Sequence, residues 1–406
     1  MKIAVLSDLH FGHAYNSELE DDCFDVAEES MEKSLACDLI VILGDIFDSR
    51  IPKTQIWAKA LKILVKPALQ ENKGVKLVKS SKELKEVSER TLNHIPVVAL
   101  HGNHERRAKG EFNTVQVIEN AGLLIHLHGE YLIFEKNGER VALHGMSNVP
   151  ERYAKEFMEN WNPKPMEGCK NILLLHQSID PYVFSPLEPP SLTLSNLPKG
   201  FDLILNGHIH GRNVTNIENT VLLIPGSPMV TQYDKSESGA EKGLNIIYTE
   251  NMKIEFVPIE RARKFIYEDV RTNSDTSIRE QIEGKLADIL SKDFFKNPII
   301  KIKVIGNEND VIEKDLKEIQ KKYSYRSFLS FVREVESVEM TQKIEFLQKL
   351  REQSLSVEEI GVQVLRKNLE ELNFNKSFDY ENVFALLADG STETAYQIII
   401  GEQRTL

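Results

Sequence analysis

Short apolar runs alternate with amphipathic stretches along the first part of the chain. Three runs rich in valine, isoleucine and leucine have the length of buried strands, at residues 2–6, 38–43 and 95–100. Residues 17–36 and 56–64 place apolar side chains at helical spacing, and residues 79–93 are interpreted as a third helix. Strands that alternate with helices predict a layered α/β fold with right-handed crossovers.

Beyond Gly122 the apolar runs become shorter. Residues 131–135 and 140–143 flank Asn137-Gly138, a dipeptide that strongly favours a hairpin turn. Further strands are expected at residues 172–175, 201–205, 221–224, 244–248 and 253–258. We expect them to complete the sheets of one domain that spans residues 1–255.

A change of pattern near residue 260 predicts two further parts. A small αβ unit is expected over residues 256–335. It would have strands at residues 264–270 and 298–304, and helices at residues 278–290 and 311–323. The last part, residues 340–406, is expected to be helical. Its apolar stripes are formed by Ile344, Leu347, Leu350, Ile360, Val364 and Leu365.

Five of the predicted strands end at side chains that bind metal ions. These side chains are Asp8, His10, Asp45, Asn103, His176, His208 and His210. Gly102 lets the backbone turn sharply after one of the strands, and open α/β sheets gather their chemistry at the carboxyl ends of their strands. Any one of these residues could be a hydrogen-bonded structural residue. Five such endings in one chain predict a shared site.

The donor types of this set point to divalent cations. Oxygen and imidazole ligands without thiolates suit manganese, iron or zinc better than magnesium. Seven ligands are too many for one ion and suffice for two if one carboxylate bridges. Two cations about 3.5–4 Å apart can bind a phosphoryl oxygen, activate a water and neutralise the charge of an in-line displacement. The set therefore predicts phosphoester hydrolysis.

Composition and charge narrow the class of protein. The formal net charge is −12, so any contact with nucleic acid must use a local basic patch. The three cysteines lack Cys-x-x-Cys spacing, and we interpret them as small buried residues in a reducing compartment. The apolar run at residues 3–6 is too short for a signal peptide, and no run approaches membrane-spanning length. We therefore expect a cytoplasmic protein.

The strand ends resemble the signature of the calcineurin-like metallophosphoesterase superfamily, which is Asp-x-His, Gly-Asp, Gly-Asn-His, His and Gly-His-x-His. The resemblance covers residues 1–255 and implies a four-layer α/β/β/α sandwich. It implies that one ion is held by Asp8, His10, Asp45 and His210. The second ion would be held by the bridging Asp45 with Asn103, His176 and His208. His104 would approach the phosphate and protonate the leaving oxygen.

Within this superfamily the chain most resembles the double-strand-break repair nucleases of the SbcD and MRN type. The closer resemblance rests on His176-Gln177, Leu197–Asp202, Pro225–Pro228, and Lys242–Leu244 followed by Phe256–Ile259. It implies an exonuclease and endonuclease that processes DNA ends with two divalent cations, for which Mn²⁺ is expected. It also implies that residues 256–335 form a capping domain that contacts DNA.

The same resemblance implies partners and a location. Residues 340–406 would bind an SMC-like ATPase of the SbcC type, and the chain would form a homodimer. The apolar residues of 56–64 and 114–124 could supply the dimer contact, although ordinary core explains them at least as well. The implied location is a prokaryotic cytoplasm, at the nucleoid.

Charged residues near the metal motifs are candidates for contacts with DNA. They are Asp48, Arg50, Lys53, Arg106, Arg107 and Arg212. Ordinary solvated surface charge explains each single one about equally well. Asp48 stands where archaeal and eukaryotic members usually have a histidine that contacts phosphate.

Three other functions remain open from the sequence. A phosphoprotein phosphatase shares Gly-Asn-His-Glu and Gly-Asp-x-x-Asp, but the Gly-His-x-His ending and the long C-terminal extension fit it poorly. A cyclic-nucleotide phosphodiesterase fits the motifs and needs no capping domain or tail. A non-catalytic scaffold for DNA ends would not need the intact ligand set.

Overall fold

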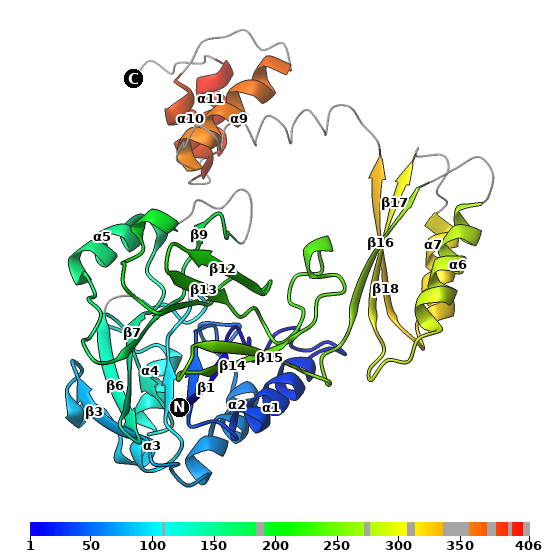
Figure 1. Cartoon of the computed structure of the whole chain (residues 1–406). Coiled ribbons are helices and arrows are strands. Elements are labelled where there is room, and N and C mark those ends of the chain that lie inside the picture. The colour runs from blue at the N-terminus through cyan, green and yellow to red at the C-terminus, as the bar shows by residue number, and fades with distance from the viewer. Residues whose placement is uncertain are drawn as a thin grey trace. The chain divides into compact units, whose positions relative to one another are not determined.

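A computed structural model describes residues 1–107, 110–183, 191–271, 277–306, 313–335, 357–371, 379–388 and 392–400. These residues fall into two compact units. The first contains the described residues up to Val335, and the second contains those from Val357 onward (Figure 1).

A six-stranded sheet carries the N-terminal motifs of the first unit. Its strand order is β15-β14-β1-β2-β4-β5. The strands are β1 (Lys2–Leu6), β2 (Leu39–Ile42), β4 (Val97–Ala99), β5 (Ile125–His126), β14 (Gly243–Tyr248) and β15 (Lys253–Pro258). β1, β2, β4 and β5 are parallel, and their register pairs Leu6 with Ile42 and Ile42 with Ala99. The carboxyl ends of β1, β2 and β4 therefore meet at one edge.

A second, seven-stranded sheet has the order β12-β13-β11-β8-β7-β6-β3. Its strands are β3 (Lys76–Ser80), β6 (Glu130–Lys136), β7 (Glu139–Met146), β8 (Lys170–Leu175), β11 (Leu203–Asn206), β12 (Asn213–Ile217) and β13 (Thr220–Ile224). The predicted hairpin around Asn137-Gly138 is confirmed as β6–β7. β8 and β11 are parallel neighbours, so their carboxyl ends also lie side by side. The short strands β9 (Ile179–Asp180) and β10 (Leu192–Thr193) pair separately.

Three apolar cores hold four layers together. Alternate side chains of the first sheet, such as Ile3 and Val41, pack against Phe134 and Leu174 of the second sheet. The other face of the first sheet packs against helices α1 (Asp22–Ser34), α2 (Thr54–Leu64) and α4 (Thr114–Asn120). The outer face of the second sheet packs against α5 (Glu151–Trp161). The predicted α/β/β/α sandwich is confirmed.

The helix predicted for residues 79–93 is wrong. Strand β3 ends at Ser80, a short 3₁₀ turn covers Leu84–Glu86, and only α3 (Glu89–Asn93) is helical. β3 is an edge strand with a register shift between Leu77 and Lys79, and most of its side chains are exposed or half-buried. An edge strand needs little apolar alternation. The charged sequence of β3 therefore lacks the pattern of a strand and was interpreted as part of a helix. The first helix is also shorter than expected, because residues 17–21 form turns.

In the αβ region (residues 265–335), the described residues form three parallel strands in the order β16-β17-β18. Its elements are β16 (Phe265–Arg271), α6 (Ile278–Leu290), β17 (Ile299–Gly306), α7 (Glu313–Tyr323) and β18 (Phe328–Val335). Both helices lie against one face of the sheet (Figure 1) and share with it a core that includes Ile282, Ile302 and Ile319. Ser277 caps α6 by accepting from the amide of Glu280.

Three helices make up the described part of the second unit: α9 (Val357–Glu371), α10 (Tyr380–Ala388) and α11 (Thr392–Ile400). A Cβ at Gly361 of α9 would lie 2.2 Å from the ring of Phe384 on α10, so this glycine allows the helices to approach closely. Val383 and Ala395 are fully buried. Ile344, Leu347 and Leu350 lie outside the described residues.

Within the described ranges, no helix is both long enough and apolar enough to cross a membrane.

Candidate metal centre

The predicted ligands converge where strand ends of the two sheets meet. The first sheet supplies Asp8 and His10 after β1, Asp45 after β2 and Asn103 after β4. The second sheet supplies His176 after β8, and His208 and His210 after β11. All but Asn103 are buried, and Asn103 is half-buried. The structure thus places seven residues from five strand ends in one site.

One group of donor atoms comes from Asp8, His10 and His210. Nε2 of His10 lies 3.2 Å from Nε2 of His210, and Oδ1 of Asp8 lies 3.8 Å from the same atom of His210. One donor atom from each of the three residues lies within 4.8 Å of the other two. Two imidazole nitrogens and a carboxylate thus point at one small volume.

A second group lies beside the first and contains Asp45, His176, His208 and Asn103. Oδ2 of Asp45 lies 3.2 Å from Nε2 of His176. Oδ1 of Asn103 lies 3.0 Å from Nδ1 of His208 and 3.3 Å from Nε2 of His176. The same Asp45 oxygen lies 4.0 Å from Nε2 of His10, so this carboxylate lies between the two groups.

The backbone is strained at four of the seven residues. Asp8, His10, Asp45 and His208 all have positive φ, at 53°, 45°, 48° and 77°. Residues other than glycine rarely adopt a positive φ, and each such residue costs on the order of 1–3 kcal/mol. Such strain clusters at functional sites, where the surrounding structure over-determines it.

The motif glycines leave room for these side chains. A Cβ at Gly102 would lie 2.0 Å from Oδ1 of Asp45. A Cβ at Gly207 would lie 2.6 Å from the hydroxyl of Ser7 and 2.8 Å from Nδ1 of His176. Glycine at both positions is therefore a packing requirement of the site.

Glu105 holds two of the motif loops together and was not predicted as a site residue. Its buried carboxylate accepts from the amides of Phe47 at 2.7 Å, Gly102 at 2.7 Å and Asp45 at 3.1 Å. Burial and then the charge of Asp45 raise the pKa of Glu105 to about 7. The only sequence signal was its place at the end of Gly-Asn-His-Glu.

Burial and mutual charge set the protonation of the centre. Burial raises the pKa of Asp8, which His176 counteracts and Asp45 reinforces. Burial opposes ionisation of Asp45 as well, but the charge of His176 and then of His10 holds its pKa well below the usual range. Burial would lower the pKa of His176, yet Asp45 raises it to about 9. Buried carboxylates that depend on protonated imidazoles form an environment suited to a divalent cation.

The donor set fits divalent cations. Imidazole and carboxylate oxygens with an amide oxygen are the ligands expected for manganese, iron or zinc. His176 is oriented by its Nδ1, which donates to the carbonyl of Leu43 at 2.5 Å and leaves Nε2 directed at Asp45. Such outer contacts fix the tautomer of a ligand histidine.

The chain was compared with models of protein families. The model described as calcineurin-like phosphoesterase matches residues 1–212, which include all seven candidate ligands. The chain belongs to the calcineurin-like phosphoesterase family.

Curated relatives of this phosphoesterase carry the name of a DNA double-strand break repair protein, Mre11. The protein from Methanopyrus kandleri is 27% identical over 324 residues, which are 73% of this chain and 66% of that protein. The one from Encephalitozoon cuniculi is 26% identical, over 70% of this chain and 52% of that protein. The one from Methanococcus maripaludis is 24% identical, over 95% of this chain and 94% of that protein. The chain thus spans less than two thirds of the first two relatives.

His104 of the phosphoesterase lies at the edge of the centre. Its Nδ1 donates to the carbonyl of Asp48 at 2.8 Å, and its amide donates to Oδ1 of Asp45 at 3.0 Å. Its ring meets that of His10 edge-on, with centroids 4.9 Å apart. A nitrogen of His104 also lies within 4.8 Å of donor atoms of His10 and Asp45. Because Nδ1 is engaged, Nε2 is the atom left for chemistry.

Asp48 lies against the ligand shell. Its Oδ1 is 3.2 Å from Nδ1 of His10 and 3.6 Å from Nδ1 of His13. Burial opposes its ionisation, but these two imidazoles hold the pKa of Asp48 well below its usual range. Nδ1 of His10 has no aligned hydrogen bond within the described residues, so the contact is electrostatic. His13, for which the sequence indicated no role, therefore lies beside Asp48 at the edge of the centre.

The remaining DNA-contact candidates divide into two groups. Arg50 and Lys53 are exposed, and Lys53 lies over the ring of Tyr15. The other three arginines have partners within the protein. Arg106 donates to Asn148 at 2.9 Å, Arg107 donates to the carbonyl of Arg50 at 2.5 Å, and Arg212 donates to Asn245 at 3.0 Å.

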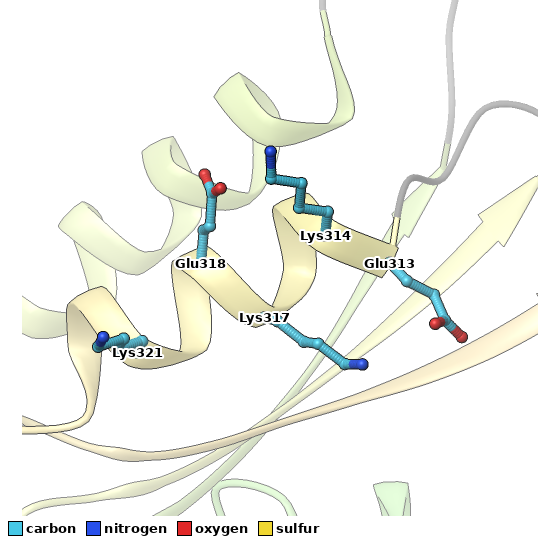
Figure 2. Close-up of a pocket in the computed structure, with 5 residues that line it drawn as sticks. All are labelled: Glu313, Lys314, Lys317, Glu318 and Lys321. Carbon is cyan, nitrogen blue, oxygen red and sulfur yellow. The ribbon is translucent and has the colours of Figure 1, made fainter.

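An open hollow of about 500 Å³ on α7 contains none of the candidate metal ligands. It is lined by Glu313, Lys314, Lys317, Glu318 and Lys321. Figure 2 shows that Lys314 and Glu318 extend to one side of α7 and that Lys317 and Glu313 extend to the other. Glu318 pairs with Arg279 of α6 at 3.1 Å. The charged groups do not converge, so this is a solvated helix face.

Proposed function

We propose that the chain is a two-metal DNA nuclease that processes DNA ends in double-strand break repair, with both exonuclease and endonuclease activity. The observation that carries the proposal is the convergence of five strand ends on one buried centre with donors for two cations. The name shared by the curated relatives supports DNA as the substrate. A phosphatase, a cyclic-nucleotide phosphodiesterase and a non-catalytic scaffold are the alternatives that the experiment below distinguishes.

In this proposal the first cation is held by Asp8, His10, Asp45 and His210. The second is held by Asp45, Asn103, His176 and His208. Mn²⁺ suits this mixture of oxygen and imidazole donors. Two bound cations would polarise the scissile phosphate, activate a water and neutralise the charge that develops during in-line displacement.

His104 is proposed to act on the leaving group. Nδ1 of His104 donates to the Asp48 carbonyl, which leaves Nε2 as the nitrogen available for proton transfer. A protonated Nε2 can donate to the leaving oxygen as a general acid, which requires hydrogen-bond reach. The hydrogen bond from the amide of His104 to Asp45 fixes the position of the two residues relative to each other.

DNA and protein partners extend the proposal. The exposed Arg50 and Lys53 are placed to contact phosphates, with weaker roles for Asp48, Arg106, Arg107 and Arg212. Residues 256–335 would act as the DNA-contacting capping domain, and residues 1–255 as the nuclease domain. Within the apolar residues of 114–124, the exposed Val117 of α4 is a candidate for a homodimer contact.

Residues 340–406 are proposed to bind an SMC-like ATPase of the SbcC type. Ile360, Val364 and Leu365 are half-buried on α9, and Leu387 and Tyr396 are exposed. Exposed apolar side chains on a small helical unit suit a partner groove. We propose that the protein works in the cytoplasm, on DNA of the nucleoid.

The experiment is a substrate comparison with the full chain. Linear duplex DNA, a phosphopeptide and a cyclic nucleotide are each incubated with the protein and Mn²⁺. The proposal predicts degradation of DNA that His104→Asn slows by about 10²- to 10⁴-fold. His94→Asn is the matched control, because Nδ1 of His94 also contacts a backbone carbonyl, that of Gln70 at 2.8 Å, outside the site. Hydrolysis of the phosphopeptide or cyclic nucleotide without DNA cleavage would contradict it.

A further inference from the structure

His210 is contacted on both its ring and its backbone by residues outside the five motifs. Nδ1 of its ring is in hydrogen-bond contact with the hydroxyl of Thr231. Its carbonyl accepts from the amide of Ser227 at 3.2 Å and from Nζ of Lys242 at 3.3 Å. A Cβ at Gly226 would lie 2.8 Å from the same carbonyl. The chain from Gly226 to Lys242 therefore wraps around one candidate ligand.

A buried ion pair organises this wrap. Lys242 and Glu237 are 6% and 3% exposed, and Nζ of Lys242 contacts Oε1 of Glu237. The other oxygen, Oε2, accepts from the amides of Thr231 at 3.0 Å and Gln232 at 2.6 Å. The carboxylate thus fixes the backbone of the residue whose hydroxyl meets His210. Lys242 also donates to the hydroxyl of Ser227 at 3.3 Å.

Buried charges are costly unless they are paired and hydrogen-bonded. Here both members of the pair use their remaining hydrogen-bonding capacity on the wrap around His210. A ligand histidine needs a partner at the nitrogen that does not bind the metal, because that partner fixes the ring and its tautomer. Nδ1–H of His210 donating to Thr231 would leave Nε2 as the ligand atom, directed at His10.

We propose that Thr231, Glu237 and Lys242 are positioning residues for His210 and thereby set the affinity of the first cation position. This inference rests on the proposed metal centre. Thr231 acts directly on the ring, Glu237 acts through Thr231, and Lys242 acts on the carbonyl of His210 and on Glu237. None of the three touches a reacting atom.

The wrap is also the attachment point of the αβ region. The hydroxyl of Ser238 accepts from the amide of Tyr267 at 2.7 Å, and the amide of Gly239 donates to the carbonyl of Phe265 at 3.1 Å. Nζ of Lys301 donates to the carbonyl of Tyr233 at 2.7 Å. The positioning residues therefore lie in a loop that is fixed at both sides, by His210 and by strands β16 and β17.

The test is titration of the full chain with Mn²⁺ by calorimetry, with the spin-coupled signal of a manganese pair followed by electron paramagnetic resonance. Thr231→Val is expected to weaken one of the two sites by about 10- to 100-fold, the usual cost of losing an outer partner of a ligand histidine, and to reduce the coupled signal. Thr231→Ser keeps the hydroxyl and is expected to restore both.

Glu237→Gln combined with Lys242→Met removes the ion pair without leaving a buried unpaired charge. We expect the same site to weaken. Lys82→Met with Glu119→Gln is the matched control, because Lys82 is also buried, at 8% exposure, and lies 3.3 Å from Glu119, outside the wrap. This control is expected to leave both manganese affinities unchanged.

Two outcomes separate failure of the inference from failure of the proposed function. Wild-type protein that binds fewer than two Mn²⁺ ions would overturn the metal centre itself. Two wild-type sites that Thr231→Val leaves at unchanged affinity would overturn the positioning role alone. Equal weakening by Thr231→Val and Thr231→Ser would also overturn it, because the hydroxyl would then not be the active group.

Discussion

His10 and His210 face each other across the candidate metal centre, yet the protein holds them by opposite means. Nδ1 of His10 lies beside the carboxylate of Asp48, whose side chain is 33% exposed. Nδ1 of His210 lies beside the neutral hydroxyl of Thr231, which a buried ion pair fixes from behind. One histidine is supported by a charged carboxylate, and the other by a neutral, half-buried hydroxyl behind which a buried ion pair lies.

The two supports have opposite electrostatic effects. Burial would lower the pKa of His10, but contact with Asp48 and the charge of Asp45 raise it. Burial, then His10 and Lys242, lower the pKa of His210 to about 2. These shifts favour a neutral His210, the form that binds a cation, and a protonated His10, whose proton a cation must displace. Two histidines with the same proposed role can therefore have pKa values that their surroundings shift in opposite directions.

The largest effect on hydrolysis should come from Asp45, because its carboxylate lies between the two groups of candidate ligands. Asp45→Asn is expected to remove one ion and nearly all hydrolysis, a loss of roughly 10³-fold or more, since the metal pair supplies several kcal/mol of charge stabilisation. Metal content by atomic emission and the rate of DNA cleavage check this. Two ions at full occupancy in the variant would refute a bridging role.

His104, on the His10 side, should affect the rate without affecting the metals. His104→Asn is expected to keep both Mn²⁺ ions and DNA affinity while turnover falls by about 10²- to 10⁴-fold, the usual contribution of a general acid. Single-turnover cleavage and a binding assay measure the two effects separately. Loss of a metal ion from this variant would make His104 a ligand instead.

The two supports should differ in their contribution to stability. Lys242→Met leaves the buried carboxylate of Glu237 unpaired and is expected to lower the free energy of unfolding by about 3–5 kcal/mol. Asp48→Asn removes a partly exposed charge and should cost less than about 1 kcal/mol. Denaturant unfolding of the metal-free variants compares them. Equal losses would mean that the partly exposed carboxylate of Asp48 and the buried Lys242–Glu237 pair contribute equally to stability.

The helical unit lies outside this comparison and should have the smallest effect on the centre. Deletion of residues 340–406 is expected to leave manganese-dependent cleavage of short single-stranded DNA intact and to abolish co-purification with the proposed SbcC-type ATPase. Pull-down and a nuclease assay on the truncated chain measure both. Unchanged ATPase binding would show that the docking surface lies elsewhere.

The sequence predicts the candidate ligands of the centre because each of them lies within four residues of the end of a short apolar strand. The layered α/β fold follows from the same pattern. Strand β3 was missed because an edge strand does not require apolar alternation. The supports were missed for another reason. Thr231, Glu237 and Lys242 act on His210 from a loop with no periodic pattern, and Asp48 reaches His10 across 38 positions of the chain. Such contacts depend on the packing of two sheets, which local patterns do not encode.

The central claim is that one buried centre holds two cations between the sheets. Anomalous diffraction from crystals of the full chain grown with Mn²⁺ tests it most directly. The account predicts two manganese peaks on either side of the Asp45 carboxylate, one next to Asp8, His10 and His210 and one next to Asn103, His176 and His208. A single peak, or peaks away from Asp45, would contradict it.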